Sequence, residues 1–272
     1  MIIEYAINYS DAMEQMPDWL PDQYAWVYLG AYFCDRYFVT TSPALWKSCF
    51  ENAQKQRKKV ALVIPTASQN NLALLKERTR TIINRYNVVI QELVVNDYGM
   101  LEWVQEQFPE IPVWLGRTMN KELRDIRYSY TTCHTKIYEQ LEAGYIQCSS
   151  VLGVEVDQTV TDEIRIQEGK HRIAVHCAWI YHSMCRICEF ASIDAPLDKK
   201  FRLFQPCKRE CIHNSISYDN YGFHFVKYGR AVYAPVQEYA FSDYHGTIRM
   251  ITCGYLPFPS MESSRNLSEV TP

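Results

Sequence analysis

The chain has 272 residues, of which 47% are hydrophobic, and it carries a net charge of -3 with an isoelectric point of about 6.2. This length suffices for one large hydrophobic core, and an α/β barrel commonly reaches it as a single domain. The charge balance lacks the basic excess typical of nucleic-acid-binding proteins, so we expect no nucleic-acid partner. No segment approaches the roughly 20 apolar residues needed to cross a bilayer, so we expect no membrane span.

The first half of the chain alternates short apolar segments with helix-like segments. The expected strands cover residues 2–7, 24–29, 60–64, 88–95 and 111–115. The expected helices cover residues 43–57, 71–86 and 99–108. Such alternation is typical of βαβ units around a parallel sheet, and continuous apolar strands indicate burial on both faces.

The second half is less regular. Strands are expected at residues 151–154, 172–177 and 247–252, a hairpin at residues 223–234 around Tyr228-Gly229-Arg230, and a helix at residues 136–143. We therefore predict one α/β, TIM-barrel-like domain over residues 1–259, with an irregular C-terminal segment that contains cysteines. Residues 260–272 are polar and predicted to form a flexible tail.

Cysteine usage and the N-terminus favour a cytoplasmic protein with reduced thiols. The chain has ten cysteines but is too large to need disulfides for stability. The first eight residues lack a basic region and include Glu4, so they are interpreted as a strand and not as a signal peptide. Some cysteines are interpreted as small apolar core residues: Cys49, Cys133, Cys148, Cys177 and Cys253.

Four other cysteines are candidate metal ligands. Cys207 and Cys211 are separated by three residues, Cys188 lies upstream, and Cys34 follows the expected strand at residues 24–29. Loops at the carboxyl ends of barrel strands build active sites, so we expect the four thiolates to meet. Four thiolates suit zinc or an iron–sulfur cluster, and the remote Cys34 favours the cluster. Zinc and the absence of metal stay open, and Cys185 is an alternative to Cys188.

Several segments of the chain, taken in order, resemble one known family. They are Tyr28-Leu-Gly-Ala-Tyr-Phe-Cys34-Asp-Arg36, Val95-Asn-Asp-Tyr-Gly99, Pro112-Val-Trp-Leu-Gly116 with Met119-Asn120, the cysteines at 188, 207 and 211, and Phe225-Val-Lys-Tyr-Gly-Arg-Ala-Val232. Their order is similar to that of the U-thirty-two peptidase-like family (collagenase-like peptidases). The cysteine run resembles the ubiquinone-biosynthesis iron–sulfur branch of that family. The resemblance covers about residues 24–255.

The resemblance implies a barrel-like fold and an oxygen-sensitive [4Fe–4S] cluster. By motif match, the ligands would be Cys34, Cys188, Cys207 and Cys211. Members of this branch work with a second family member as a heterodimer in oxygen-independent hydroxylation of an aromatic ring. That implies a small aromatic or prenylated substrate. The chain departs from the branch in the longer interval between Cys188 and Cys207 and in residues 118–155, so the substrate is not carried over.

Two other functions remain open alongside this reading. One is a cysteine- or metal-dependent peptidase, in which Cys34 is the nucleophile and His176 the base, although the chain lacks the usual protease motifs. The other is a non-catalytic accessory subunit stabilised by metal.

Several polar residues have both a structural and a functional interpretation. Asp97, after Asn96, is expected to cap the helix that follows, and a place in the site mouth is compatible with that role. His176, on a strand, and His182, in the following loop, are interpreted as hydrogen-bonded structural residues. Cations near the cysteines would stabilise a negatively charged cluster or are simply solvated: Arg36, Lys208 and Arg209. His213 and Asn214 are candidate donors near the cluster.

Overall fold

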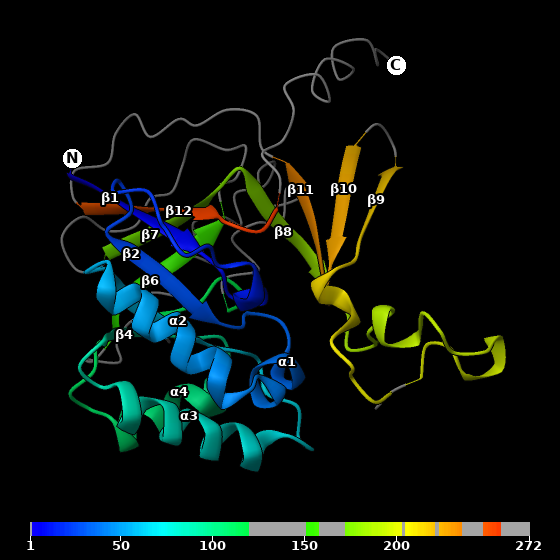
Figure 1. The fold of residues 1–272 in the computed structure, drawn as a ribbon, viewed down its shortest axis with the longest axis horizontal. Coiled ribbons are helices and arrows are strands. Elements are labelled where there is room, and N and C mark those ends of the chain that lie inside the picture. The colour runs from blue at the N-terminus through cyan, green and yellow to red at the C-terminus, as the bar shows by residue number, and fades with distance from the viewer. Residues whose placement is uncertain are drawn as a thin grey trace, which may run out of the picture.

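The computed structural model describes residues 2–119, 151–157, 172–202, 205–220, 223–235 and 247–256. Within them, eight parallel strands close a barrel in the order β1-β12-β7-β6-β5-β4-β3-β2 (Figure 1). The strands are β1 (Ile2–Asn8), β2 (Trp26–Gly30), β3 (Lys59–Ile64), β4 (Ile90–Val95), β5 (Val113–Leu115), β6 (Val151–Asp157), β7 (Arg172–Cys177) and β12 (Thr247–Cys253). The predicted TIM-barrel-like α/β fold is confirmed.

Helices follow the second, third and fourth strands and cover the outside of the barrel on one side (Figure 1). They are α2 (Pro43–Lys55), α3 (Leu72–Tyr86) and α4 (Tyr98–Gln107). Each agrees with its prediction within two residues because its apolar face recurs at the helical period. A fourth, α1 (Asp35–Thr40), was not predicted. The helix expected at residues 136–143 and the tail expected from residue 260 lie outside the described residues.

Alternate residues of each strand pack on opposite faces of the barrel wall. In β2, Val27 and Leu29 belong to the outer core beneath the helices, whereas Trp26 and Tyr28 belong to the inner core. Burial on both faces explains why the strands are continuously apolar. The inner face also carries charged residues, which include Arg249 and Glu92.

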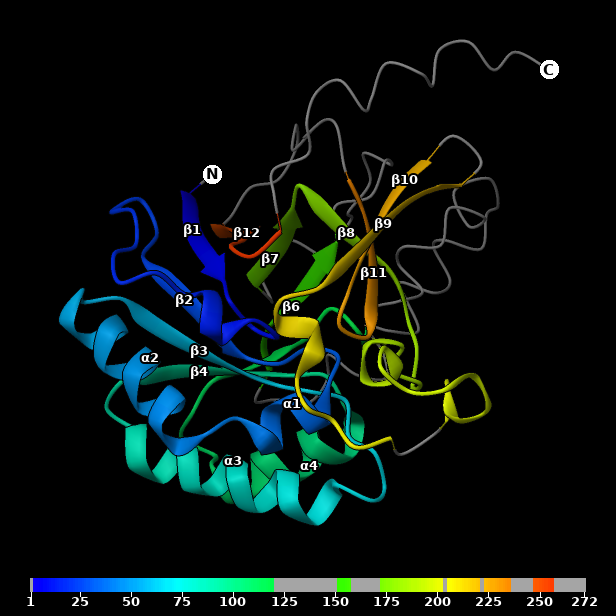
Figure 2. The same ribbon diagram turned by 45° about the vertical axis from the view of Figure 1, so that its right-hand side comes forward.

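A second, antiparallel sheet lies beside the mouth of the barrel, in the order β8-β11-β10-β9 (Figure 2). Its strands are β8 (Trp179–Met184), β9 (Ser215–Asn220), β10 (Phe223–Tyr228) and β11 (Ala231–Pro235). Tyr181 and Tyr233 pack in the inner core with Phe33 of the barrel. The predicted hairpin is β10–β11, but β8 and β9 were not predicted, and β8 contains His182, which was expected in a loop.

The carboxyl end of β2 requires glycine. Gly30 has a φ of 122°, and a Cβ atom there would lie 2.2 Å from the carbonyl oxygen of Val63. This close approach lets the chain turn from the barrel wall into the segment that carries Cys34.

Candidate metal centre

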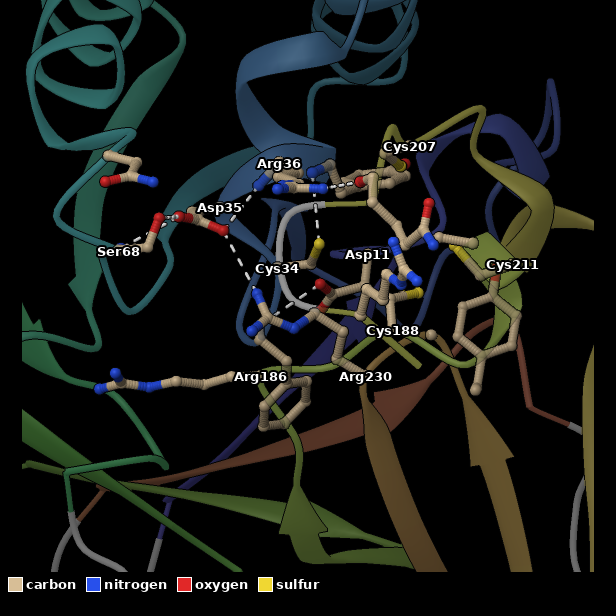
Figure 3. A pocket seen from close by; sticks show the side chains of 18 of the residues that line it. Asp11, Cys34, Asp35, Arg36, Ser68, Arg186, Cys188, Cys207, Cys211 and Arg230 are labelled. Carbon is tan, nitrogen blue, oxygen red and sulfur yellow. Dashed lines mark hydrogen bonds and ion pairs between the residues drawn. The ribbon is translucent and has the colours of Figure 1, made fainter. Parts of the chain in front are cut away.

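The four predicted cysteines line one cavity of about 230 Å³. Figure 3 shows Cys34, Cys188, Cys207 and Cys211 around one side of it, with Asp35 and Ser68 on the opposite side. The cavity far exceeds the roughly 10–15 Å³ that one water molecule requires. Cys185 is exposed and does not line the cavity. Between the two alternatives, the structure therefore places Cys188 with the other three thiols.

The cysteines reach this place by a route that differs from the expected one. Only Cys34 follows a barrel strand directly, at the carboxyl end of β2. Cys188, Cys207 and Cys211 lie on the connection from β8 to β9, two strands of the antiparallel sheet. Because β8 starts after a single residue beyond β7, that sheet and its connection lie against the barrel mouth.

The loop that carries Cys34 is shaped by a buried carboxylate. Asp11 accepts backbone hydrogen bonds from Tyr32 at 2.9 Å and from Phe33 at 3.4 Å. Burial raises the pKa of Asp11 to about 6, although these hydrogen bonds oppose the shift. Cys34 caps α1, and its sulfur accepts the backbone N–H of Tyr37 at 3.4 Å. The hydrogen bonds to Asp11 hold the backbone before Cys34, and the hydrogen bond from Tyr37 holds its sulfur.

The thiols stand in an environment that disfavours their charged form. Burial is the main reason that the pKa of Cys34 is raised to about 12; Arg230 opposes the shift, and the nearby Cys207 contributes to it. Burial also raises the pKa of Cys207 and of Cys211, with added repulsion from the other thiolates of the group. These mutual effects show that the thiols interact electrostatically across the cavity.

Four arginines among the described residues line the cavity: Arg36, Arg186, Arg202 and Arg230. Arg230 forms an ion pair with Asp35 at 3.3 Å and donates to the carbonyl of Cys185 at 2.8 Å. Asp35 also accepts hydrogen bonds from Ser68 and Asn71, which hold its pKa below the usual value against the effect of burial.

Of the cations expected near the cysteines, only Arg36 lines the cavity. Lys208 is exposed, and Arg209 is paired with Glu14. His213 and Asn214 do not line the cavity either, and the Asn214 amide donates to the carbonyl of Glu210 at 2.6 Å.

Within the described residues, no three His, Cys, Asp or Glu side chains gather closely enough to hold a single metal ion. The cavity nevertheless offers four soft thiol donors, partial shielding from solvent and a cationic rim. Thiolate donors of this kind, four in number, are those that iron–sulfur clusters use, so the residues present fit such a group.

A buried polar network in the barrel interior was missed at the level of sequence. Tyr32 donates to Glu155 at 2.8 Å, His176 contacts the same carboxylate at 3.2 Å, and Arg117 is paired with Asp157. Burial raises the pKa of Glu155 to about 8. A signal for this network was present in the sequence, because charged residues occur within otherwise apolar strand segments. Charged residues are rarely buried without partners, so they predict a buried polar network.

Three other predictions can be compared with the structure. The Asp97 carboxylate accepts the backbone N–H of Met100 at 3.1 Å, which confirms it as the cap of α4. The hydrogen-bonded interpretation of His176 is confirmed by its contact with Glu155. His182 is exposed in β8, where its ring packs edge-on against Phe225 at 5.2 Å.

Comparison of the chain with protein-family models, with curated proteins and with solved structures found no match. In the described part of the chain, none of the helices has the length and apolar character to traverse a bilayer.

Proposed function

We propose that this protein binds one [4Fe–4S] cluster through Cys34, Cys188, Cys207 and Cys211. The observation that carries the proposal is their convergence: the thiol of Cys34, after β2, and three thiols of the β8–β9 connection line one cavity. Buried cysteines scattered by ordinary packing have no reason to converge in this way, because each fills a gap in its own part of the core.

The electrostatics of the cavity support a bound cationic group. Burial and mutual repulsion raise the pKa of the thiols at Cys34, Cys207 and Cys211. Metal binding needs thiolates, and the positive charge of bound iron would favour loss of the thiol protons. The arginines at the rim would offset the negative charge of a cluster with four thiolate ligands.

The chemistry that such a cluster supplies when bound is the transfer of single electrons. Cys34, Cys188, Cys207 and Cys211 would all serve as ligands of the cluster, which favours electron transfer over direct binding of substrate. In this proposal the cysteines hold the cluster, the arginines lower the cost of its charge, and the β10–β11 turn, with Tyr228 and Gly229, forms one wall of its cavity.

The wider role rests on the resemblance described above. We infer that the protein serves, as one subunit of a heterodimer with a second family member, in oxygen-independent hydroxylation or a related redox modification. A small aromatic or prenylated compound is the proposed substrate class, and the cytoplasm the proposed location.

The peptidase alternative has less support from the site. No histidine is among the described residues that line the cavity, and His176 contacts Glu155 in the barrel interior. The Cys34 thiol, whose pKa is raised to about 12 by burial, is not activated as a nucleophile would be. A hydrolase would need a base within hydrogen-bonding reach of that sulfur.

The test is the iron and acid-labile sulfide content per chain, with the visible spectrum, of protein purified without oxygen. We expect close to four irons and four sulfides. Alanine variants of Cys34, Cys188, Cys207 and Cys211 should lose them. Cys185→Ala is the matched control, because Cys185 lies three residues from Cys188 but outside the cavity, and it should keep the cluster.

Other outcomes redirect the proposal clearly. Stoichiometric zinc that is lost in the same four variants would replace the cluster with a structural metal. Full folding without any metal, together with peptide hydrolysis that Cys34→Ala abolishes, would support the peptidase. Loss of iron in Cys185→Ala but not in Cys188→Ala would contradict the ligand assignment.

A further inference from the structure

The segment that carries Cys207 and Cys211 is attached to the barrel by three polar contacts and by the packing of Ile212 against the core. Arg36 of α1 donates to the carbonyl of Gln205. Arg209 is paired with Glu14 beside the barrel mouth. Gln15 donates to the carbonyl of Ile212 at 3.0 Å. The barrel-side partners of the polar contacts all belong to two short elements, η1 (Met13–Gln15) and α1.

The middle contact is the most elaborate. The Arg209 guanidinium meets the Glu14 carboxylate and lies over the ring of Tyr37, 4.4 Å from its centroid. The other oxygen of Glu14 accepts the Tyr37 hydroxyl at 2.6 Å. The Arg209 side chain is 17% exposed and the Glu14 side chain 24% exposed, so the ion pair is partly desolvated. Such a pair is stronger than one on an open surface.

The backbone of Arg209 supports the same conclusion. Its φ is 65°, in the left-handed region that residues other than glycine rarely adopt. A strained conformation of this kind persists where surrounding contacts determine it. Here the strained residue lies between the two cysteines; its side chain contacts Glu14 and Tyr37, and its carbonyl accepts the backbone N–H of Ile212 at 3.1 Å.

Tyr37 connects this contact to the remote cysteine. Its ring receives Arg209, and its backbone N–H donates to the sulfur of Cys34 at 3.4 Å. One residue therefore contacts both the loop of Cys34 and the segment of Cys207 and Cys211. The neighbouring Lys208, by contrast, is exposed to solvent.

We propose that Arg209 is a positioning residue that locks the segment of Cys207 and Cys211 onto Glu14 and Tyr37, so that the four thiols are assembled before any metal binds. The consequence for cluster retention rests on the proposed function, whereas the lock itself does not. Without Arg209, the segment loses its ion pair with Glu14 and opens from the barrel more often, while its cysteines remain intact.

The test compares Arg209→Gln, Glu14→Gln, the double variant and the control Lys208→Gln in the full-length chain. Amide hydrogen exchange of the peptide spanning residues 205–214 is measured on the protein as purified. Alkylation of Cys207 and Cys211 by iodoacetamide is measured after addition of a chelator. We expect both rates to rise about tenfold in either single variant, no further in the double variant, and by less than about twofold in Lys208→Gln.

The direction of the alkylation change separates opening from a simple charge effect. Removal of a cation beside a thiol takes away stabilisation of its thiolate and by itself slows alkylation, whereas opening of the segment speeds it. A faster reaction therefore reports detachment of the segment. Exchange in β3 should stay unchanged, which verifies that the barrel is folded, and Glu14→Gln tests the same contact from the barrel side if Arg209→Gln fails to fold.

Rates in Arg209→Gln equal to those in Lys208→Gln would overturn the lock, as would effects of the two single variants that multiply in the double variant. A purified protein without iron would refute the proposed cluster and leave this comparison intact. An iron-containing protein whose Arg209→Gln variant behaves like Lys208→Gln would keep the cluster and refute the lock.

Discussion

Tyr32 donates its hydroxyl proton to Glu155 at 2.8 Å, and both side chains are fully buried inside the barrel. The hydrogen bond joins β6 to the loop that ends at Cys34. It favours the charged form of Glu155, yet burial outweighs it and raises the pKa of the carboxyl group from 4.5 to about 8. The barrel interior therefore holds an acid that is largely protonated at neutral pH.

Glu155 should make the stability of the protein depend on pH. Between about pH 5 and pH 8 the folded chain holds a proton on Glu155 that the unfolded chain has lost, so the free energy of unfolding falls as pH rises. The slope from one such group is at most about 1.4 kcal/mol per pH unit. Urea unfolding across this range should show a flatter slope for Glu155→Gln than for the wild type. Glu102→Gln, which removes an exposed carboxylate on α4, should keep the wild-type slope, and parallel curves for all three proteins would contradict the prediction.

Removal of Arg249 should destabilise the base of the barrel. Its guanidinium lies between the rings of Trp26 and Trp114, at 3.8 and 4.8 Å, and donates to Glu92 at 2.5 Å. Arg249→Met leaves the Glu92 carboxylate buried without its partner, which should lower the free energy of unfolding by about 3–5 kcal/mol. Urea unfolding measures this loss.

The second change at this site tests the cause. Adding Glu92→Gln to Arg249→Met removes the unpaired charge and should restore part of the lost stability. The surface pair Lys47–Glu51, 3.7 Å apart and more than half exposed, provides the control, since Lys47→Gln should cost less than about 1 kcal/mol. A double variant less stable than Arg249→Met would show that lost packing against the tryptophans dominates.

Replacement of Arg230 should change the redox properties of a bound cluster. Arg230 lines the cavity, and its charge lowers the pKa of the Cys34 thiol. Loss of a cation beside the cluster disfavours the reduced, more negative state, so Arg230→Gln should lower the midpoint potential. The expected shift is on the order of tens of millivolts, since a tenfold change in a one-electron equilibrium corresponds to about 59 mV.

The potential is measured by a spectroscopic redox titration of the anaerobically purified protein. Lys208→Gln removes a charge that lies close in sequence but is exposed to solvent, so its potential should stay near that of the wild type. An Arg230→Gln protein that retains its iron and has the same midpoint potential as the wild type would contradict the role given to the cationic rim.

Much of the barrel was predictable because its elements are locally encoded. The strand at residues 172–177 has the predicted bounds, and α2 and α3 follow from apolar residues at the helical period. One helix and two strands, α1, β8 and β9, were not predicted, and each omission has a physical reason. The six residues of α1 are too few to show a period, β9 is exposed along its whole length, and β8 begins one residue after β7, so the two read as a strand and a loop.

The candidate site divides in the same way. Residue type and spacing were enough to single out Cys34, Cys188, Cys207 and Cys211 as thiols suited to one metal centre, but they left Cys185 open as an alternative to Cys188. Only the folded chain distinguishes them, since β8 pairs with β11 as far as Met184, leaving Cys185 exposed while the chain then carries Cys188 into the cavity.

By itself, the sequence determined the repeating strands and helices and the chemical character of the cysteines, because these depend on neighbours along the chain. The tertiary structure decided which side chains surround those cysteines: Arg230 rather than Lys208 at the cavity, and Glu14 and Tyr37 beneath Arg209. Such partners are separated by up to about two hundred positions. Their meeting depends on how the barrel closes and how the second sheet packs against it, and no local pattern of residues encodes that.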